Sequence, residues 1–131
     1  ITTLNSFSAN RTTTSATYAE INTEIRNEFI VWAGEVIQLS ANGKNDHGTG
    51  SGTCNTSIGI DGTTAEDTFF ENQIAAGPVT QGFSVSLYKT GLTEGYHYAT
   101  ILGFTAGGTA TWVGSGTAGT RSTLRGFAKL D

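Results

Sequence analysis

The chain contains little cysteine, proline, methionine and charge. The low counts of cysteine and of basic residues each argue against one kind of structure or partner. Its 131 residues contain one Cys, one Pro and no Met, and charged residues make up 14%. A single cysteine forms no internal disulfide, so the fold must be held by its core. Only seven Lys and Arg residues are present, scattered in a chain of formal net charge −4, which argues against a nucleic-acid groove. No apolar run approaches the roughly 18 residues of a membrane span.

What the chain does contain favours β-strands. Gly numbers 18, Thr and Ser are abundant, and β-branched and aromatic residues recur in short runs between turn residues. Eight to ten short strands with no convincing helix predict an all-β antiparallel sandwich or barrel. The length suits one domain over residues 1–131, in which residues 1–10 form an N-terminal arm or an edge strand.

The stretch Gly91–Gly116 carries the strongest strand signal. Two runs rich in Thr, Ile, Val and aromatic residues flank Gly107-Gly108, and a Gly-Gly pair adopts the positive φ of a two-residue hairpin turn. The resulting register places Trp112 over Gly103, where no side chain blocks the indole ring. One face would carry Tyr98, Leu102, Phe104 and Val113, and the other would carry Ala99, Ile101, Ala110 and Trp112.

Both faces of this predicted hairpin are apolar, whereas a sandwich hairpin ordinarily has one wet face. We therefore expect a neighbouring subunit to cover the second face. The candidate subunit interface consists of Ala99, Ile101, Ala110 and Trp112.

Other segments read as ordinary strands. Gly82–Thr90 is one-sided, with Phe83, Val85 and Leu87 pointing one way. Thr123–Leu130 is predicted as the last strand, and Glu66–Ala76 as a further one. Glu28–Asn42 is predicted as a second hairpin turning at Gly34-Glu35. Its expected cross-strand pairs are Ile30 with Leu39 and Trp32 with Ile37.

The residues that carry chemistry do not form a catalytic pattern. A nucleophile needs a nearby base, and the only histidines are His47, in a polar loop, and His97, expected as a half-buried strand histidine bonded to backbone. Cys54 is expected as a small buried strand residue. We expect no catalytic residue and no cofactor.

The acidic residues do not predict a metal site or a glycosidase. The loop carboxylates are Asp46, Asp61, Glu66 and Asp67, and their spacing is not that of a calcium loop. Asp61-Gly62 is better explained as a turn in which Gly takes positive φ. A retaining glycosidase needs two carboxyls about 5 Å apart, and the sequence does not place Glu66, Asp67 or Glu71 in that way.

Sugar recognition is the best binding candidate. Gly43–Thr53 and Gly114–Thr120 are polar and Gly-rich, and loops at the tips of a sandwich often carry binding surfaces. The candidate binding residues in them are Asn45, Asp46, His47, Thr49, Ser115 and Thr117. Tyr88, Tyr96 and Trp32 are candidate sugar-stacking rings, although strand aromatics more often lie in a core or subunit interface.

Four segments resemble small jelly-roll domains in structural proteins of tailed bacteriophages, which are similar to trimeric tumour-necrosis-factor-like sandwiches. The matching segments are Thr12–Ile21, Ile58–Thr63, Ser84–Leu87 and Gly91–Ile101. The resemblance implies a jelly-roll-like β-sandwich of about eight to ten strands that forms a homotrimer.

The function implied by this resemblance is a non-enzymatic one on the virion surface. The chain would serve as a tail-fibre tip, head fibre or capsid decoration. Its partners would be other copies of itself, other virion proteins and a host-surface glycan. The alternative that the residues leave open is a carbohydrate-binding module of a larger protein.

Overall fold

The computed structural model describes residues 2–6, 9–23, 26–48, 52–74, 80–115 and 121–130, which form two antiparallel sheets packed face to face. The first sheet, sheet A, contains β1 (Thr2–Ser6), β2 (Arg11–Thr13), β5 (Glu35–His47), β8 (Gln81–Lys89), β10 (Ala110–Trp112) and β11 (Thr123–Leu130). The second, sheet B, contains β3 (Ala19–Glu20), β4 (Asn27–Val31), β6 (Gly52–Ile60), β7 (Phe70–Ile74) and β9 (Gly95–Thr105).

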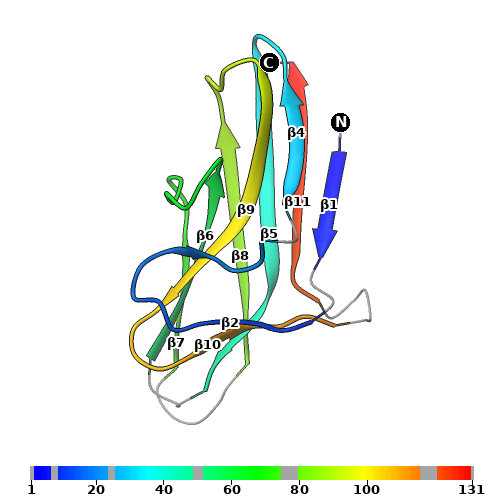
Figure 1. Cartoon of the computed structure of the whole chain (residues 1–131). Coiled ribbons are helices and arrows are strands. Elements are labelled where there is room, and N and C mark those ends of the chain that lie inside the picture. The colour runs from blue at the N-terminus through cyan, green and yellow to red at the C-terminus, as the bar shows by residue number, and fades with distance from the viewer. Residues whose placement is uncertain are drawn as a thin grey trace.

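The long strands β5 and β9 organise the two sheets (Figure 1). β5 pairs with β8 along one edge, and along the other with β11 and then with β10. β9 pairs with β6 along one edge, and along the other with β4 and then with β3. The order across sheet A is thus β1 and β2, then β11 and β10, then β5, then β8. Across sheet B it is β4 and β3, then β9, β6 and β7.

This order is that of a jelly roll, with four strand positions in each sheet and connections that cross between the sheets. The jelly-roll-like β-sandwich is confirmed. The described residues form eleven strands rather than eight to ten, because three of the eight positions are each shared by two shorter strands. β1 lies at the edge of sheet A, paired with β11.

The predicted hairpin at Gly107-Gly108 is wrong. Both glycines adopt positive φ, 78° and 76°, but the turn carries the chain from β9 in sheet B to β10 in sheet A, where β10 pairs with β2 and β5. Trp112 nevertheless lies over Gly103, since a Cβ at Gly103 would be 2.5 Å from Trp112 Cζ2. The contact is made across the sandwich and not across a hairpin.

The predicted hairpin at Gly34-Glu35 is wrong for the same reason. Gly34 has a φ of 78°, yet β4 pairs with β9 while β5 pairs with β8 and β11. Ile30 and Trp32 are 49% and 63% exposed and do not face the buried Leu39 and Ile37. A short glycine turn suits both a hairpin and a crossing between sheets, so it does not determine the pairing.

The candidate subunit interface is also wrong. Ala99, Ile101, Ala110 and Trp112 are at most 2% exposed within the single chain and belong to the core between the sheets. These four residues meet because β9 and β10 face each other from opposite sheets. A homotrimer remains a prediction, and its interface must lie at other residues.

The opposite face of β9 is covered by the chain itself, which explains why both faces are apolar. Leu102 on that face is fully buried. A Cβ added at Gly59 of the neighbouring β6 would lie 2.8 Å from Leu102 Cδ1 and 2.5 Å from Gly62 O, and Ser57 Oγ donates a hydrogen bond to Thr68 O at 2.5 Å. The segment between β6 and β7 therefore packs over the outside of sheet B, which removes the sequence-based reason for an oligomer.

The remaining strand predictions agree better with the structure. Phe83, Val85 and Leu87 of β8 are buried while the residues between them are exposed, as predicted. β11 occupies the predicted range Thr123–Leu130, and Leu124 is fully buried. Strict alternation of apolar and polar residues is a local signal, so it survives the errors in pairing.

Candidate functional site

In the predicted binding loop Gly43–Thr53, residues 43–47 and 52–53 are strand, which corrects two candidate residues. Asn45, Asp46 and His47 belong to β5, and Asn45 and His47 are fully buried. The side chains of Asn45 and His47 point into the core, and that of Asp46 between them points to the outer face and is half-buried. In the second predicted binding loop, Gly114–Thr120, Ser115 is half-buried. Thr49 and Thr117 lie outside the described residues.

Asn45 instead joins the two sheets through a polar network inside the core. Its Oδ1 accepts a hydrogen bond from Asn72 Nδ2 at 2.8 Å, and its Nδ2 donates to Thr56 Oγ1 at 3.4 Å. Trp112 Nε1 donates to the same Thr56 oxygen at 3.0 Å. Buried polar groups need such partners, so this network has a structural role.

His47 and Cys54 have no catalytic geometry. A ring nitrogen of His47 is hydrogen-bonded to Gly107 O. Cys54 is fully buried as predicted, and its Sγ donates to Asp46 O at 3.3 Å. Burial, followed by the charge of Asp46, raises the pKa of the Cys54 thiol to about 11. The thiol therefore stays protonated at neutral pH and is a poor nucleophile.

His97 is 6% exposed in β9 and has an oxygen acceptor at each ring nitrogen. Nε2 lies 2.7 Å from Thr93 O, which is the hydrogen bond to backbone that the sequence predicts. Nδ1 lies 2.5 Å from Asp61 Oδ2. Burial lowers the pKa of His97, but the hydrogen bonds to Asp61 and Thr93 and the Asp61 charge outweigh it, so the pKa is raised. The imidazolium form satisfies both acceptors.

Asp61 holds this arrangement by an unusual backbone conformation. Its own φ is +59°, whereas the sequence predicted positive φ at Gly62. Asp is among the few side chains that tolerate this region. Asp61 Oδ1 also accepts a hydrogen bond from Tyr98 N at 3.0 Å. His97 and Asp61 thus fasten the end of β6 to β9, which is a structural task.

We expect the folded protein to become less stable as the pH rises through the raised pKa of His97. Below the ordinary value of 6.5 the ring is protonated in both the folded and unfolded states, so the stabilisation is fully present. Above the folded-state pKa the ring loses a proton and one of its two hydrogen bonds. Urea denaturation between pH 5 and 9 measures the effect. An Asp61→Asn variant should show a weaker dependence on pH, and identical curves would contradict the assignment.

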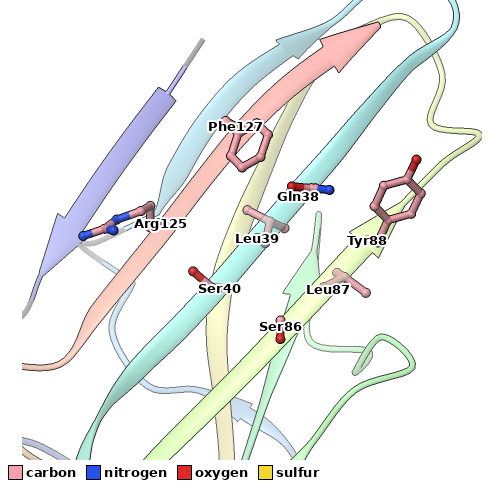
Figure 2. A pocket seen from close by; sticks show the side chains of 8 residues that line it. All are labelled: Gln38, Leu39, Ser40, Ser86, Leu87, Tyr88, Arg125 and Phe127. Carbon is pink, nitrogen blue, oxygen red and sulfur yellow. The ribbon is translucent and has the colours of Figure 1, made fainter. Parts of the chain in front are cut away.

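A groove of about 420 Å³ lies on the outer face of sheet A (Figure 2). It is lined by residues of three neighbouring strands: Gln38, Leu39 and Ser40 of β5, Ser86, Leu87 and Tyr88 of β8, and Arg125 and Phe127 of β11. The register places Tyr88 and Phe127 on either side of Gln38, and Ser86 and Arg125 on either side of Ser40. The groove therefore has two rows of side chains that run across the strands.

The first row presents two exposed aromatic rings beside an amide. Tyr88 is 52% exposed and Phe127 is 39% exposed, and Figure 2 shows their rings on either side of Gln38. Tyr88 is one of the three rings predicted for sugar stacking, and the alternative that it lies in the core is wrong. Sequence reasoning missed Phe127, although alternation with the buried Leu124 places it on the outer face of β11.

The other two predicted rings lie on a different surface. Trp32 and Tyr96 are 63% and 60% exposed, so neither is a core residue. Tyr96 pairs in register with Ile30 on the outer face of sheet B, and its hydroxyl donates to Glu28 Oε1 at 2.8 Å. The three predicted rings therefore do not form one site.

The described lining of the groove offers groups that bind. It presents the Gln38 amide, the hydroxyls of Ser40, Ser86 and Tyr88, the Arg125 guanidinium and two aromatic rings, and it includes no Asp, Glu, His or Cys. A serine hydroxyl needs a neighbouring base to become a nucleophile, and the described lining residues supply none, so the groove suits recognition. Among the described residues, no cluster of three or more metal-ligating side chains is present, and no helix is long and apolar enough to cross a membrane.

Two comparisons with known proteins give no relative from which a function can be inferred. A scan against protein-family models finds no match to this chain, and a search of curated proteins also finds none. The function is therefore argued from the groove on sheet A.

Proposed function

We propose that the chain is a non-catalytic adhesion module that binds carbohydrate in the groove on the outer face of sheet A. The observation that supports this most directly is the pair of exposed rings, Tyr88 and Phe127, on either side of Gln38. Aromatic faces pack against the C–H faces of sugar rings. The Gln38 amide and the hydroxyls of Ser40 and Ser86 both donate and accept hydrogen bonds, as sugar hydroxyls require.

The spacing of the two rings favours an oligosaccharide. Tyr88 and Phe127 stand on strands that flank β5, so their backbones are two strand spacings apart, about 10 Å. One sugar ring is too short to reach both aromatic rings. The ligand in this proposal lies across the strands, with separate sugars on Tyr88 and Phe127.

The setting that we propose is the virion surface, on the strength of the resemblance to phage jelly-roll domains. There the groove would bind a host-surface glycan, and the domain would be a fibre tip, head fibre or capsid decoration assembled as a homotrimer. A carbohydrate-binding module of a larger protein would use the same groove. Locating the domain on a particle by electron microscopy distinguishes the two settings.

Truncating the rings of the groove should weaken glycan binding. A glycan array selects the ligand, and calorimetry then measures Kd. We expect Tyr88→Ala and Phe127→Ala each to raise Kd by about 10-fold, near 1–2 kcal/mol, because each removes a stacking surface. The control is Tyr96→Ala, which removes an equally exposed ring from sheet B and should leave Kd unchanged. Failure of the unaltered chain to bind any glycan, or equal effects of all three variants, would contradict the proposal.

A further inference from the structure

The two sheets differ in charge. Among the described residues that line the groove on sheet A, Arg125 is the one charged side chain. Farther along β5, the same face carries Lys44 and, two residues on, Asp46. The chain as a whole has a net charge of −4. Two of the nine acids among the described residues, Glu35 and Asp46, lie on β5 of sheet A. The other seven belong to the strands of sheet B and the segments beside them, namely Glu20, Glu28, Asp61, Glu66, Asp67, Glu71 and Glu94. The face that carries the groove is therefore the one suited to an anion.

Arg125 is the charged group of the groove itself. It is exposed, it lines the groove beside Phe127, and it is the cross-strand neighbour of Ser40. No carboxylate of the described residues pairs with it. Arg26 shows the contrasting case, since its guanidinium donates two hydrogen bonds of 2.8 Å to Glu20 and lies over the Tyr98 ring. The guanidinium N–H groups of Arg125 thus form no ion pair with an acid in the part of the chain that the structure describes, and they can bind an acid group of a ligand.

Arg125 reaches a ligand in the groove through a change of rotamer. In Figure 2 its side chain extends from β11 towards β1, away from Ser40. Cross-strand neighbours have Cβ atoms about 5 Å apart, so rotation about the stem dihedrals of Arg125 brings the guanidinium over Ser40. In that rotamer the methylene groups of Arg125 can pack beside the ligand, and the guanidinium stays at the solvent-exposed edge of the groove.

Building on the proposed carbohydrate site, we infer that its ligand is an anionic oligosaccharide and that Arg125 binds the acid group. A guanidinium presents a planar fork of N–H donors that matches a carboxylate or sulfate oxygen pair. Tyr88 and Phe127 hold the sugar rings in the first row, and the acid group lies over the second row, between Arg125 and Ser40. Lys44 lies farther along the same face, outside the groove and two residues from Asp46, so the charge nearest the ligand is that of Arg125.

The test compares oligosaccharides of one length that differ only in charge. Calorimetry is performed with the full chain and with three hexasaccharides: one built of uronic acids, its methyl ester and a sulfated one. We expect the acid form to bind roughly 10-fold more tightly than the ester, in the range that a hydrogen bond to a charged group contributes. Arg125→Gln should remove that difference, and Arg125→Lys should restore part of it. Lys44→Gln removes the same charge from the same face but outside the groove, and should preserve most of the difference.

The outcomes separate this inference from the proposal on which it rests. Equal affinity for acid and ester, with binding still weakened by Tyr88→Ala, overturns the anionic ligand and supports the carbohydrate site. An Arg125→Gln variant that loses ester and acid binding equally shows a packing role and also overturns it. Absence of binding to all oligosaccharides, neutral ones included, contradicts the carbohydrate site as well. Preference for the sulfated or the carboxylated ligand identifies which acid group Arg125 takes.

Discussion

Replacing Trp112 with alanine is expected to lower the free energy of unfolding by about 3–5 kcal/mol, the range for truncating a buried Trp. The indole is fully buried at the centre of the core and packs on Gly103 of the opposite sheet. Its Nε1 donates to Thr56 Oγ1 at 3.0 Å, so truncation also weakens the polar network between the sheets. Urea denaturation followed by far-UV circular dichroism measures the change. A loss below about 1 kcal/mol would show that the ring does not support the core.

Two variants make this test specific. Trp32→Ala removes a 63% exposed indole and should change stability by less than about 1 kcal/mol. Gly103→Ala places a methyl group 2.5 Å from Trp112 Cζ2, and overpacking of this kind costs about 1–3 kcal/mol. In the Trp112→Ala background the same methyl group enters the vacated space and should cost much less. Additive effects of the two substitutions would contradict the contact.

Gly43→Ala is expected to be the second most damaging substitution, lowering the free energy of unfolding by about 3 kcal/mol. Gly43 lies where β5 changes partners, between Asn42, which pairs with β11, and Asn45, which pairs with β10. A Cβ there would lie 2.7 Å from Ser122 Cα. Ser122 is itself buried and fixed, since its N and Oγ both donate to Val113 O at 3.0 and 2.8 Å. Because the obstacle is backbone, the strand has to shift.

The matched control is Gly82→Ala on the neighbouring strand. Among the described residues, a Cβ at Gly82 would meet only Gly43 O, at an ordinary contact distance of 3.8 Å. The free energy of unfolding of this variant should therefore lie within about 1 kcal/mol of that of the unaltered chain. Thermal unfolding of both variants gives the comparison. If Gly43→Ala and Gly82→Ala have the same Tm, the close approach of Ser122 does not limit this position.

The candidate groove was only partly predictable from the sequence. Tyr88 follows from the alternation of Gly82–Thr90, which separates buried Phe83, Val85 and Leu87 from the outward side chains. Gln38 and Phe127 come from distant parts of the chain, and only the register of β5 with β8 and β11 places all three in one row. No local pattern encodes that register, because it depends on which strands pair.

The local sequence by itself determined the all-β class, the positions of most strands and the glycine turns, since alternation and backbone freedom are properties of neighbouring residues. The tertiary structure alone decided whether each turn closes a hairpin or crosses between sheets. Gly107-Gly108 adopts the predicted φ values in a crossing, and Trp112 still meets Gly103. The tertiary structure also decided that the second apolar face of β9 is covered by the chain's own segment, where Gly62 O lies over Gly59 beside Leu102. Burial of apolar surface is favourable whichever residues cover it. An apolar face therefore predicts that something covers it and does not identify the covering segment.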